Sequence, residues 1–144
     1  IFVGEGYDLP AMKAYSSELG LDDRVIFTGP IRDRELLRVF YSTADLFFFP
    51  STYDTCGIVV KEAAACDCPS LLLKGSCAAE GAIHNASGYL ADETPASCAD
   101  VIMSACNDRA AMRLVGERAS RDLYLSWEDA VARAYDRYRR ILKR

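Results

Sequence analysis

The chain has 144 residues, of which 51% are hydrophobic and 26% charged, values typical of one globular domain with its own core. A formal net charge of −4 gives no support to a nucleic-acid-binding or membrane-surface role. The sequence shows no signal peptide and no apolar run of the ~20 residues that a membrane span needs, so we expect a cytoplasmic protein. Because the chain opens on the strand-like Ile1-Phe2-Val3 without an initiator Met, we interpret it as a fragment of a longer protein.

Strand-like and helix-like segments alternate along the chain. The apolar and turn patterns predict strands, in chain order, at residues 2–3, 24–28, 44–49, 69–73 and 88–90. They predict helices at residues 10–19, 33–42, 57–66, 77–84, 94–105, 108–123 and 126–142. The apolar run 46–49 indicates a strand buried on both faces, and Thr94 and Ser126 are the expected N-caps of their helices. The alternation predicts an α/β fold of one domain, a Rossmann-like parallel sheet flanked by helices on both faces.

The last predicted helix ends in a basic stretch. Residues 133–144 hold six Lys or Arg side chains against one acid, Asp136. This segment is either a solvated helical face or a docking helix for another domain or for anionic lipid headgroups.

The six cysteines favour a structural role. Cys66 and Cys68 form a Cys-x-Cys pair and His84 is the only histidine, so the paired Cys-x-x-Cys or added histidines of most metal sites are missing. Four cysteines stand in apolar or helical contexts, where free Cys behaves as a small hydrophobe: Cys56, Cys66, Cys98 and Cys106. We expect reduced cysteines and no metal site, with zinc or disulfides as the alternative.

Two segments could carry chemistry, and the first is weak. Gly4 and Gly6 follow the first strand, but the third glycine and the ribose-binding acid of the dinucleotide fingerprint are absent from the expected spacing. The pair is either a plain turn or a close approach to a ligand.

The second segment, residues 54–69, places Asp54 and Glu62 around Gly57 just after an apolar strand. Gly57 lets the backbone approach a ligand, and residues 57–60 would form the first turn of a helix, an end that attracts phosphate. Glu62, one turn further, suits the vicinal hydroxyls of a ribose, and Asp54 could take the hydroxyls of a second sugar. Alternatively, both acids only favour the helix N-terminus electrostatically.

The chain resembles the carboxyl-terminal domain of the retaining glycosyltransferases of family 4 (group 1), which have the two-domain GT-B fold. The family signature is an acid, seven residues and then Glu, followed by Ala-x-Ala-x-Gly-x-Pro. The chain fits it with Asp54-Thr55-Cys56-Gly57 and with Glu62-Ala63-Ala64-Ala65-Cys66-Asp67-Cys68-Pro69. Further matches to the family's sequence motifs occur in order along almost the whole chain, at Gly4-Glu5-Gly6, residues 19–29, Tyr41-x-x-Ala44-Asp45-Leu46, Phe49-Pro50-Ser51, Gly88-Tyr89-Leu90 and Ser126-Trp127-Glu128.

The resemblance implies that this domain binds a nucleotide-sugar donor, such as a UDP- or GDP-hexose, with no other cofactor. Glu62 would hold the ribose, and Asp54 would contact the transferred sugar as the catalytic residue. Ile31 and Arg32 would frame the base, with Gly6 close by. The remaining donor contacts are expected in the loop and first turn, at Thr55 and at the backbone amides of Cys56, Gly57, Ile58 and Val59.

The resemblance also implies metal-independent transfer of a hexose, with retention, to a lipid, polysaccharide or small-molecule acceptor. The basic residues that neutralise the diphosphate and the acceptor-binding amino-terminal domain would lie upstream, so we expect the fragment alone to be inactive. The last helix would cross to that domain, and the whole protein could associate with a membrane surface.

The chain departs from the family pattern at three places: Asp54 replaces Glu, Cys56 replaces an aromatic residue, and Asp67-Cys68 replaces a small residue followed by a variable position. A non-catalytic nucleotide-binding or interaction module on the same fold is the alternative function.

Overall fold

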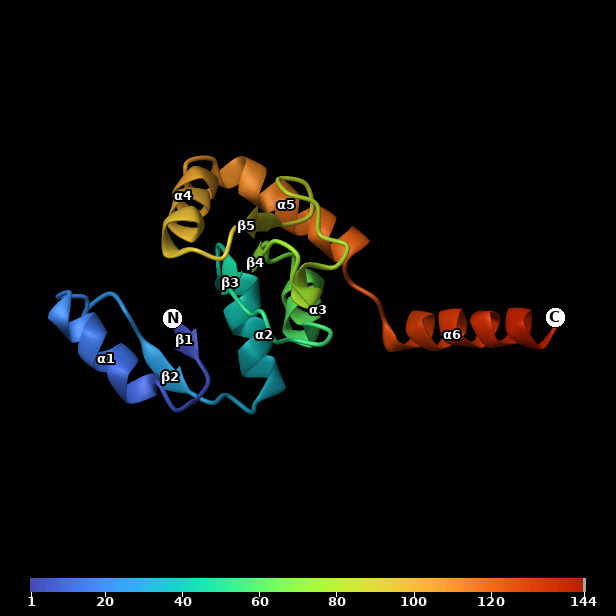
Figure 1. Cartoon of the computed structure of the whole chain (residues 1–144), viewed down its shortest axis with the longest axis horizontal. Helices are drawn as coiled ribbons and strands as arrows, with labels where there is room; N and C mark the ends of the chain where they lie inside the picture. Colours follow the sequence, from blue (N-terminus) through green and yellow to red (C-terminus); the bar gives the residue numbers. More distant parts are fainter. Residues whose placement is uncertain (144) are drawn as a thin grey trace. The chain divides into compact units, whose positions relative to one another are not determined.

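The computed structural model describes residues 1–143 (Figure 1). The chain forms two compact units, Ile1–Phe40 and a second one from Tyr41 onward, and each is described by itself.

The first unit holds a two-stranded parallel sheet. β1 (Phe2–Val3) pairs with β2 (Phe27–Gly29), and the helix α1 (Leu9–Glu18) connects them. The rings of Phe2 and Phe27 stack across the pair with centroids 5.0 Å apart. β2 begins three residues later than predicted because the amides of Arg24 and Val25 both bond back to the carbonyl of Leu21, at 2.9 Å, and so belong to a turn.

The helix α2 (Arg34–Thr43) contains the boundary between the two units. Asp33 caps its start, because Oδ1 accepts the amides of Glu35 and Leu36 at 2.9 and 3.2 Å.

The second unit is built on a three-stranded parallel sheet. Its strands β3 (Phe47–Phe49), β4 (Ser70–Leu73) and β5 (Tyr89–Ala91) lie in the order β3-β4-β5. Phe48 lies opposite Leu71, and Leu72 lies opposite Leu90. β4 is the central strand, and all four of its residues are buried.

Helices cover both faces of this sheet (Figure 1). The side chains of β4 alternate, so Leu72 packs with Val60 of α3 (Ile58–Ala65), whereas Leu71 and Leu73 face α4 (Pro95–Cys106) and α5 (Arg109–Asp122). The predicted α/β class, with parallel strands and helices on both faces, is therefore confirmed. The described strands form two separate sheets instead of one.

Two further predicted elements differ from the structure. β3 is only half-buried, and the side chain of Phe48 is 43% exposed because it lines an open pocket beside α4. The expectation that both faces of this strand are buried is therefore wrong at Phe48. The helix predicted at 77–84 shortens to one 3-10 turn, η1 (Cys77–Ala79), because Glu80 leaves the helical conformation with ψ 122°.

The predicted N-caps are confirmed. The side chain of Thr94 accepts the amide of Ser97 at 3.2 Å, and that of Ser126 accepts the amide of Asp129 at 3.0 Å. Ser126 opens α6 (Trp127–Leu142), a helix that buries none of its residues. Its large apolar side chains are all exposed: Trp127, Val131, Tyr135, Tyr138, Ile141 and Leu142. Within residues 1–143, every helix is too short or too polar to cross a bilayer.

Candidate functional site

The loop before α3 is ordered by its own acid. One oxygen of the Asp54 carboxylate, Oδ1, accepts the amide of Gly57 at 2.7 Å and the amide of Cys56 at 3.1 Å. These bonds lower the pKa of the Asp54 carboxyl, that from Gly57 contributing most and that from Cys56 less. The side chain is therefore a carboxylate at neutral pH, folded back against the start of the helix.

Gly57 is the N-cap of α3, and a side chain at this position would be both strained and crowded. Its backbone is left-handed, with φ 57° and ψ 48°. A Cβ at this position would lie 3.0 Å from the Cα and 3.1 Å from the Cβ of Ala78. Close packing of Gly57 against Ala78 of η1 thus fixes the end of the loop 54–57, whose start is ordered by Asp54.

The first turn of α3 keeps two donors free. The amides of Val60 and Lys61 bond back to the carbonyl of Gly57, at 2.8 and 3.4 Å. The amides of Ile58 and Val59 have no acceptor anywhere in residues 1–143. A pair of unpaired amides at the positive end of a helix dipole is suited to an anion such as a phosphate.

Glu62 lies one turn further along α3, four residues after Ile58 and so on the same side of the helix. It is half-buried, and no hydrogen bond or ion pair holds its carboxylate within the described part of the chain. Burial and then the negative charge of Glu62 raise the pKa of Tyr41 to about 12. Tyr41 therefore keeps its hydroxyl proton at neutral pH near this carboxylate.

Sequence reasoning gave Tyr41 no role in the site. The available signal was its place in the Tyr41-x-x-Ala44-Asp45-Leu46 match, which by itself points to no ligand contact.

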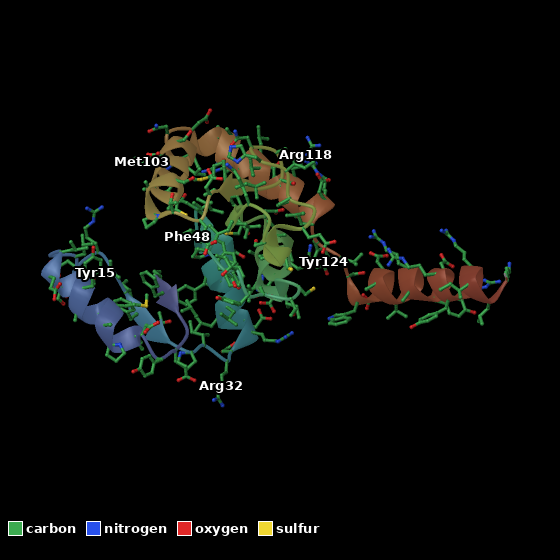
Figure 2. The ribbon with its side chains drawn as sticks, in the orientation of Figure 1. Tyr15, Arg32, Phe48, Met103, Arg118 and Tyr124 are labelled. Atoms are coloured by element: carbon green, nitrogen blue, oxygen red, sulfur yellow. The ribbon has the colours of Figure 1, made fainter. Side chains whose placement is uncertain are left out.

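The structure brings together the expected residues of the second unit, from Asp54 to Glu62, whereas three others belong to the first unit. Gly6 accepts the amide of Leu9 at 3.2 Å in a turn that leads into α1. Ile31 is half-buried, and the exposed side chain of Arg32 extends away from the loop before α2 (Figure 2).

The cysteines only partly follow the expectation. Cys68 and Cys98 are buried, and burial raises the pKa of the Cys68 thiol to about 11. Cys56 and Cys106, expected as small apolar residues, are exposed because one lies in the site loop and the other ends α4. All six are unpaired, and residues 1–143 contain no group of His, Cys, Asp and Glu side chains that could hold a metal ion.

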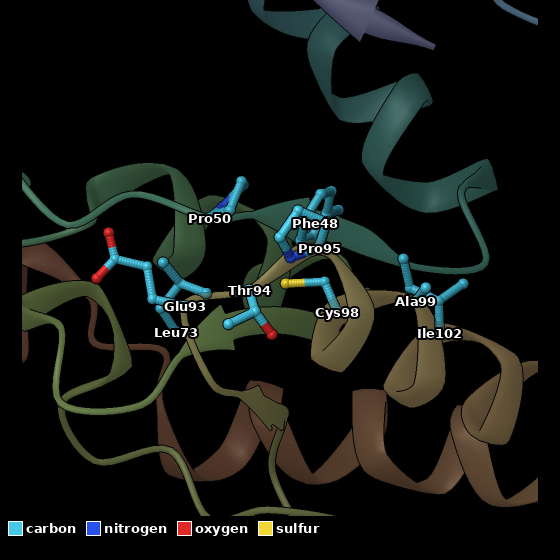
Figure 3. A pocket seen from close by; sticks show the side chains of 9 residues that line it. All are labelled: Phe48, Pro50, Leu73, Glu93, Thr94, Pro95, Cys98, Ala99 and Ile102. Carbon is cyan, nitrogen blue, oxygen red and sulfur yellow. The ribbon is translucent and has the colours of Figure 1, made fainter. Parts of the chain in front are cut away.

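A separate pocket of about 470 Å³ lies beside α4, next to the exposed face of β3 (Figure 3). Sequence reasoning did not point to it, because its residues are ordinary apolar positions of a strand and a helix. Only one lining residue is charged, Glu93, so few polar groups are present to orient a ligand. The lining residues are Phe48, Pro50, Leu73, Glu93, Thr94, Pro95, Cys98, Ala99 and Ile102.

Residues 1–122 match the family model described as Glycosyl transferases group 1. The chain belongs to this family. One similar group 1 glycosyltransferase is the D-inositol 3-phosphate glycosyltransferase of Xylanimonas cellulosilytica, 29% identical over 136 residues, which cover 92% of this chain and 32% of that protein.

Solved structures of the GT-B fold are similar as well. Sucrose-phosphate synthase from Thermosynechococcus elongatus aligns over 96% of this chain and 35% of its own length, with a TM-score of 0.82 and 28% identity. Anabaena HepE, solved in complex with UDP-glucose, aligns over 82% of this chain and 34% of its own, with a TM-score of 0.71 and 26% identity. The chain thus spans about a third of the length of each of these three proteins.

Proposed function

We propose that the chain is the donor-binding domain of a retaining glycosyltransferase, which transfers a hexose from a nucleotide sugar to a lipid, polysaccharide or small-molecule acceptor. The observation that carries the proposal is the start of α3, where two unpaired amides and an unpaired carboxylate lie within one helical turn. An anion and a diol are the two groups that a nucleoside diphosphate presents side by side. The UDP-glucose complex of HepE, a relative at 26% identity, supports the same ligand class.

Each group has a defined task in this proposal. The amides of Ile58 and Val59 bind the diphosphate, as charge-assisted hydrogen bonds at a helix N-terminus. Glu62 accepts the ribose hydroxyls, and the neutral side chain of Tyr41 lies near that carboxylate. The segment near Ile31 and Arg32 frames the base, and Gly6 leaves room for the ligand.

The proposed reaction follows from how the donor is bound. Binding fixes the diphosphate, so the anomeric carbon of the donor is held for attack by an acceptor hydroxyl. The acceptor oxygen bonds to the anomeric carbon on the face from which the diphosphate leaves, so the anomeric configuration is retained. The bond from that carbon to the phosphate oxygen breaks, and the leaving phosphate takes the proton of the acceptor hydroxyl without a metal. The basic residues that neutralise the diphosphate and the acceptor site belong to other parts of the protein, so this chain alone carries out no transfer.

The last helix fits a larger protein. The exposed apolar side of α6, from Trp127 to Leu142, supports packing against an acceptor-binding domain outside this chain. We expect such a protein to work in the cytoplasm, with its acceptor at a membrane surface where the acceptor is a lipid.

The second candidate is a nucleotide-binding module without catalysis, since the donor half alone does not fix the activity. Such a module would bind the nucleotide in the same way as the proposed donor-binding domain, but the whole protein would transfer no sugar.

Isothermal titration with UDP, GDP and ADP sugars tests the proposal. Glu62→Ala should weaken the bound nucleotide by roughly 10- to 100-fold, because one charge-assisted bond is worth about 1.5–3 kcal/mol. Glu93→Ala removes an exposed acid outside the site and should leave the affinity unchanged. If neither this chain nor the longer polypeptide that contains it binds any of these nucleotide sugars, the proposal is refuted. Binding with no transfer by that polypeptide would favour the second candidate.

A further inference from the structure

Asp54 already has a partner inside the chain. Its Oδ1 accepts the backbone amides of Cys56 and Gly57, and no side chain in residues 1–143 forms a hydrogen bond or an ion pair with the carboxylate. This is the geometry by which short acids cap turns and helix starts. The acid that the family resemblance assigns to the transferred sugar is thus folded back onto its own loop.

The two amides that Asp54 caps are among the four backbone amides, those of residues 56–59, that the family resemblance assigns to donor binding. Cys56 and Gly57 donate to Asp54, which leaves only Ile58 and Val59 facing outward. Asp54 therefore sets which amides a ligand meets, while the contact of Gly57 with Ala78 sets where the loop lies.

We propose that Asp54 is a positioning residue for the donor site. Its carboxylate shapes the loop 54–57 so that the amides of Ile58 and Val59 can bind the diphosphate. Because all nucleoside diphosphates contain this group, Asp54 should affect the affinity for UDP and for UDP-glucose equally. This inference rests on the proposed function, and it replaces the sugar contact expected for Asp54.

The length of the side chain decides between the two roles. Asn keeps an oxygen at the position of Oδ1 and is as good a cap as Asp. Glu carries one more methylene, which moves the carboxylate beyond the two amides, and Ala has no acceptor. A capping role thus tolerates Asn and rejects Glu, whereas a sugar contact of the family type tolerates Glu and depends on the charge.

The test titrates UDP and UDP-glucose into the full chain and into Asp54→Asn, Asp54→Glu and Asp54→Ala. We expect Asp54→Asn to keep both dissociation constants within about twofold of the original. Asp54→Glu and Asp54→Ala should weaken the binding of both ligands roughly fivefold and by the same factor, the effect expected when a cap is lost. Asp108→Ala is the matched control, because Asp108 caps α5 through the amide of Ala111 at 2.9 Å and lies outside the site. It should leave both constants unchanged.

Amide hydrogen exchange measured without ligand gives an independent readout. The amides of Cys56 and Gly57 should be protected in the original chain and in Asp54→Asn, and should exchange faster in Asp54→Ala and Asp54→Glu. Unchanged exchange in Asp54→Ala would overturn the inference.

The titration can overturn it too. If Asp54→Asn selectively weakens UDP-glucose while Asp54→Glu binds it normally, Asp54 contacts the sugar. If the original chain and the longer polypeptide bind neither ligand, a UDP-dependent donor function fails, whereas the exchange measurement still decides what Asp54 does in the loop.

Discussion

At Gly116, in the middle of α5, helix propensity and packing disagree. Ala is favoured over Gly inside a helix by about 1 kcal/mol, so the sequence alone predicts that Gly116→Ala stabilises the protein. In the structure, however, a Cβ at Gly116 would lie 2.0 Å from the carbonyl oxygen of Asp67 and 2.9 Å from its carbonyl carbon. Both atoms are backbone and follow α3, so the added methyl group would push α5 and the end of α3 apart.

The size of the effect follows from that distance. Ordinary contact begins at 3.4 Å, so the two backbones must separate by about 1.4 Å. Overpacking of this kind costs about 1–3 kcal/mol, and the upper end applies because no flexible side chain can give way. After the helix propensity is subtracted, we expect Gly116→Ala to lower the free energy of unfolding by about 2 kcal/mol.

Urea unfolding followed by circular dichroism measures this change. Glu117→Ala, at the next and exposed position of the same helix, is the control and should change stability by less than about 0.5 kcal/mol. A Gly116→Ala protein as stable as the original, or more stable, would refute the packing argument.

Three further predictions concern the site loop and the end of α3. Gly57→Ala should destabilise the chain by about 1–2 kcal/mol more than Gly75→Ala in urea unfolding, because both glycines have positive φ but only Gly57 meets a neighbour; equal losses would contradict this. Asp67→Gly should stabilise the chain by up to about 1 kcal/mol, since Asp67 has φ 55° and glycine adopts that conformation without strain; a lower urea midpoint would contradict this. The Asp54 cap, whose folded pKa is below the usual 3.8, should persist above pH 3.8 and weaken as pH falls through the folded value. Faster exchange of the Cys56 and Gly57 amides at low pH would show it, after correction for intrinsic rates, and Asp54→Asn should lack that step.

The sequence predicted well the features that depend on local chemistry. The caps Thr94 and Ser126 were recognisable because a hydroxyl residue precedes a helical pattern, and the structure has both hydrogen bonds. The central strand was recognisable because an apolar run followed a proline, and its four residues are buried.

What could not be predicted depends on distant neighbours. The exposure of Phe48 follows from the pocket beside α4, which contains residues about 45 positions further along. The division of the strands into two sheets also involves pairings that no local pattern records. In the site, the sequence left two roles open for Asp54, a contact with a sugar or an electrostatic role at the helix N-terminus. Only the backbone conformation reveals that its carboxylate folds back onto the amides of Cys56 and Gly57.

The burial of β4 also limits how this domain can change in evolution. Leu72 packs toward α3, while Leu71 and Leu73 pack toward α4 and α5. Inserting or deleting one residue within β4 would turn the leucine side chains to the opposite faces of the sheet. It would also shift the register of β4 with β3 and β5. Aliphatic exchanges should therefore be tolerated in β4, whereas a change in length would have to be absorbed outside the strand, before Ser70 or after Leu73.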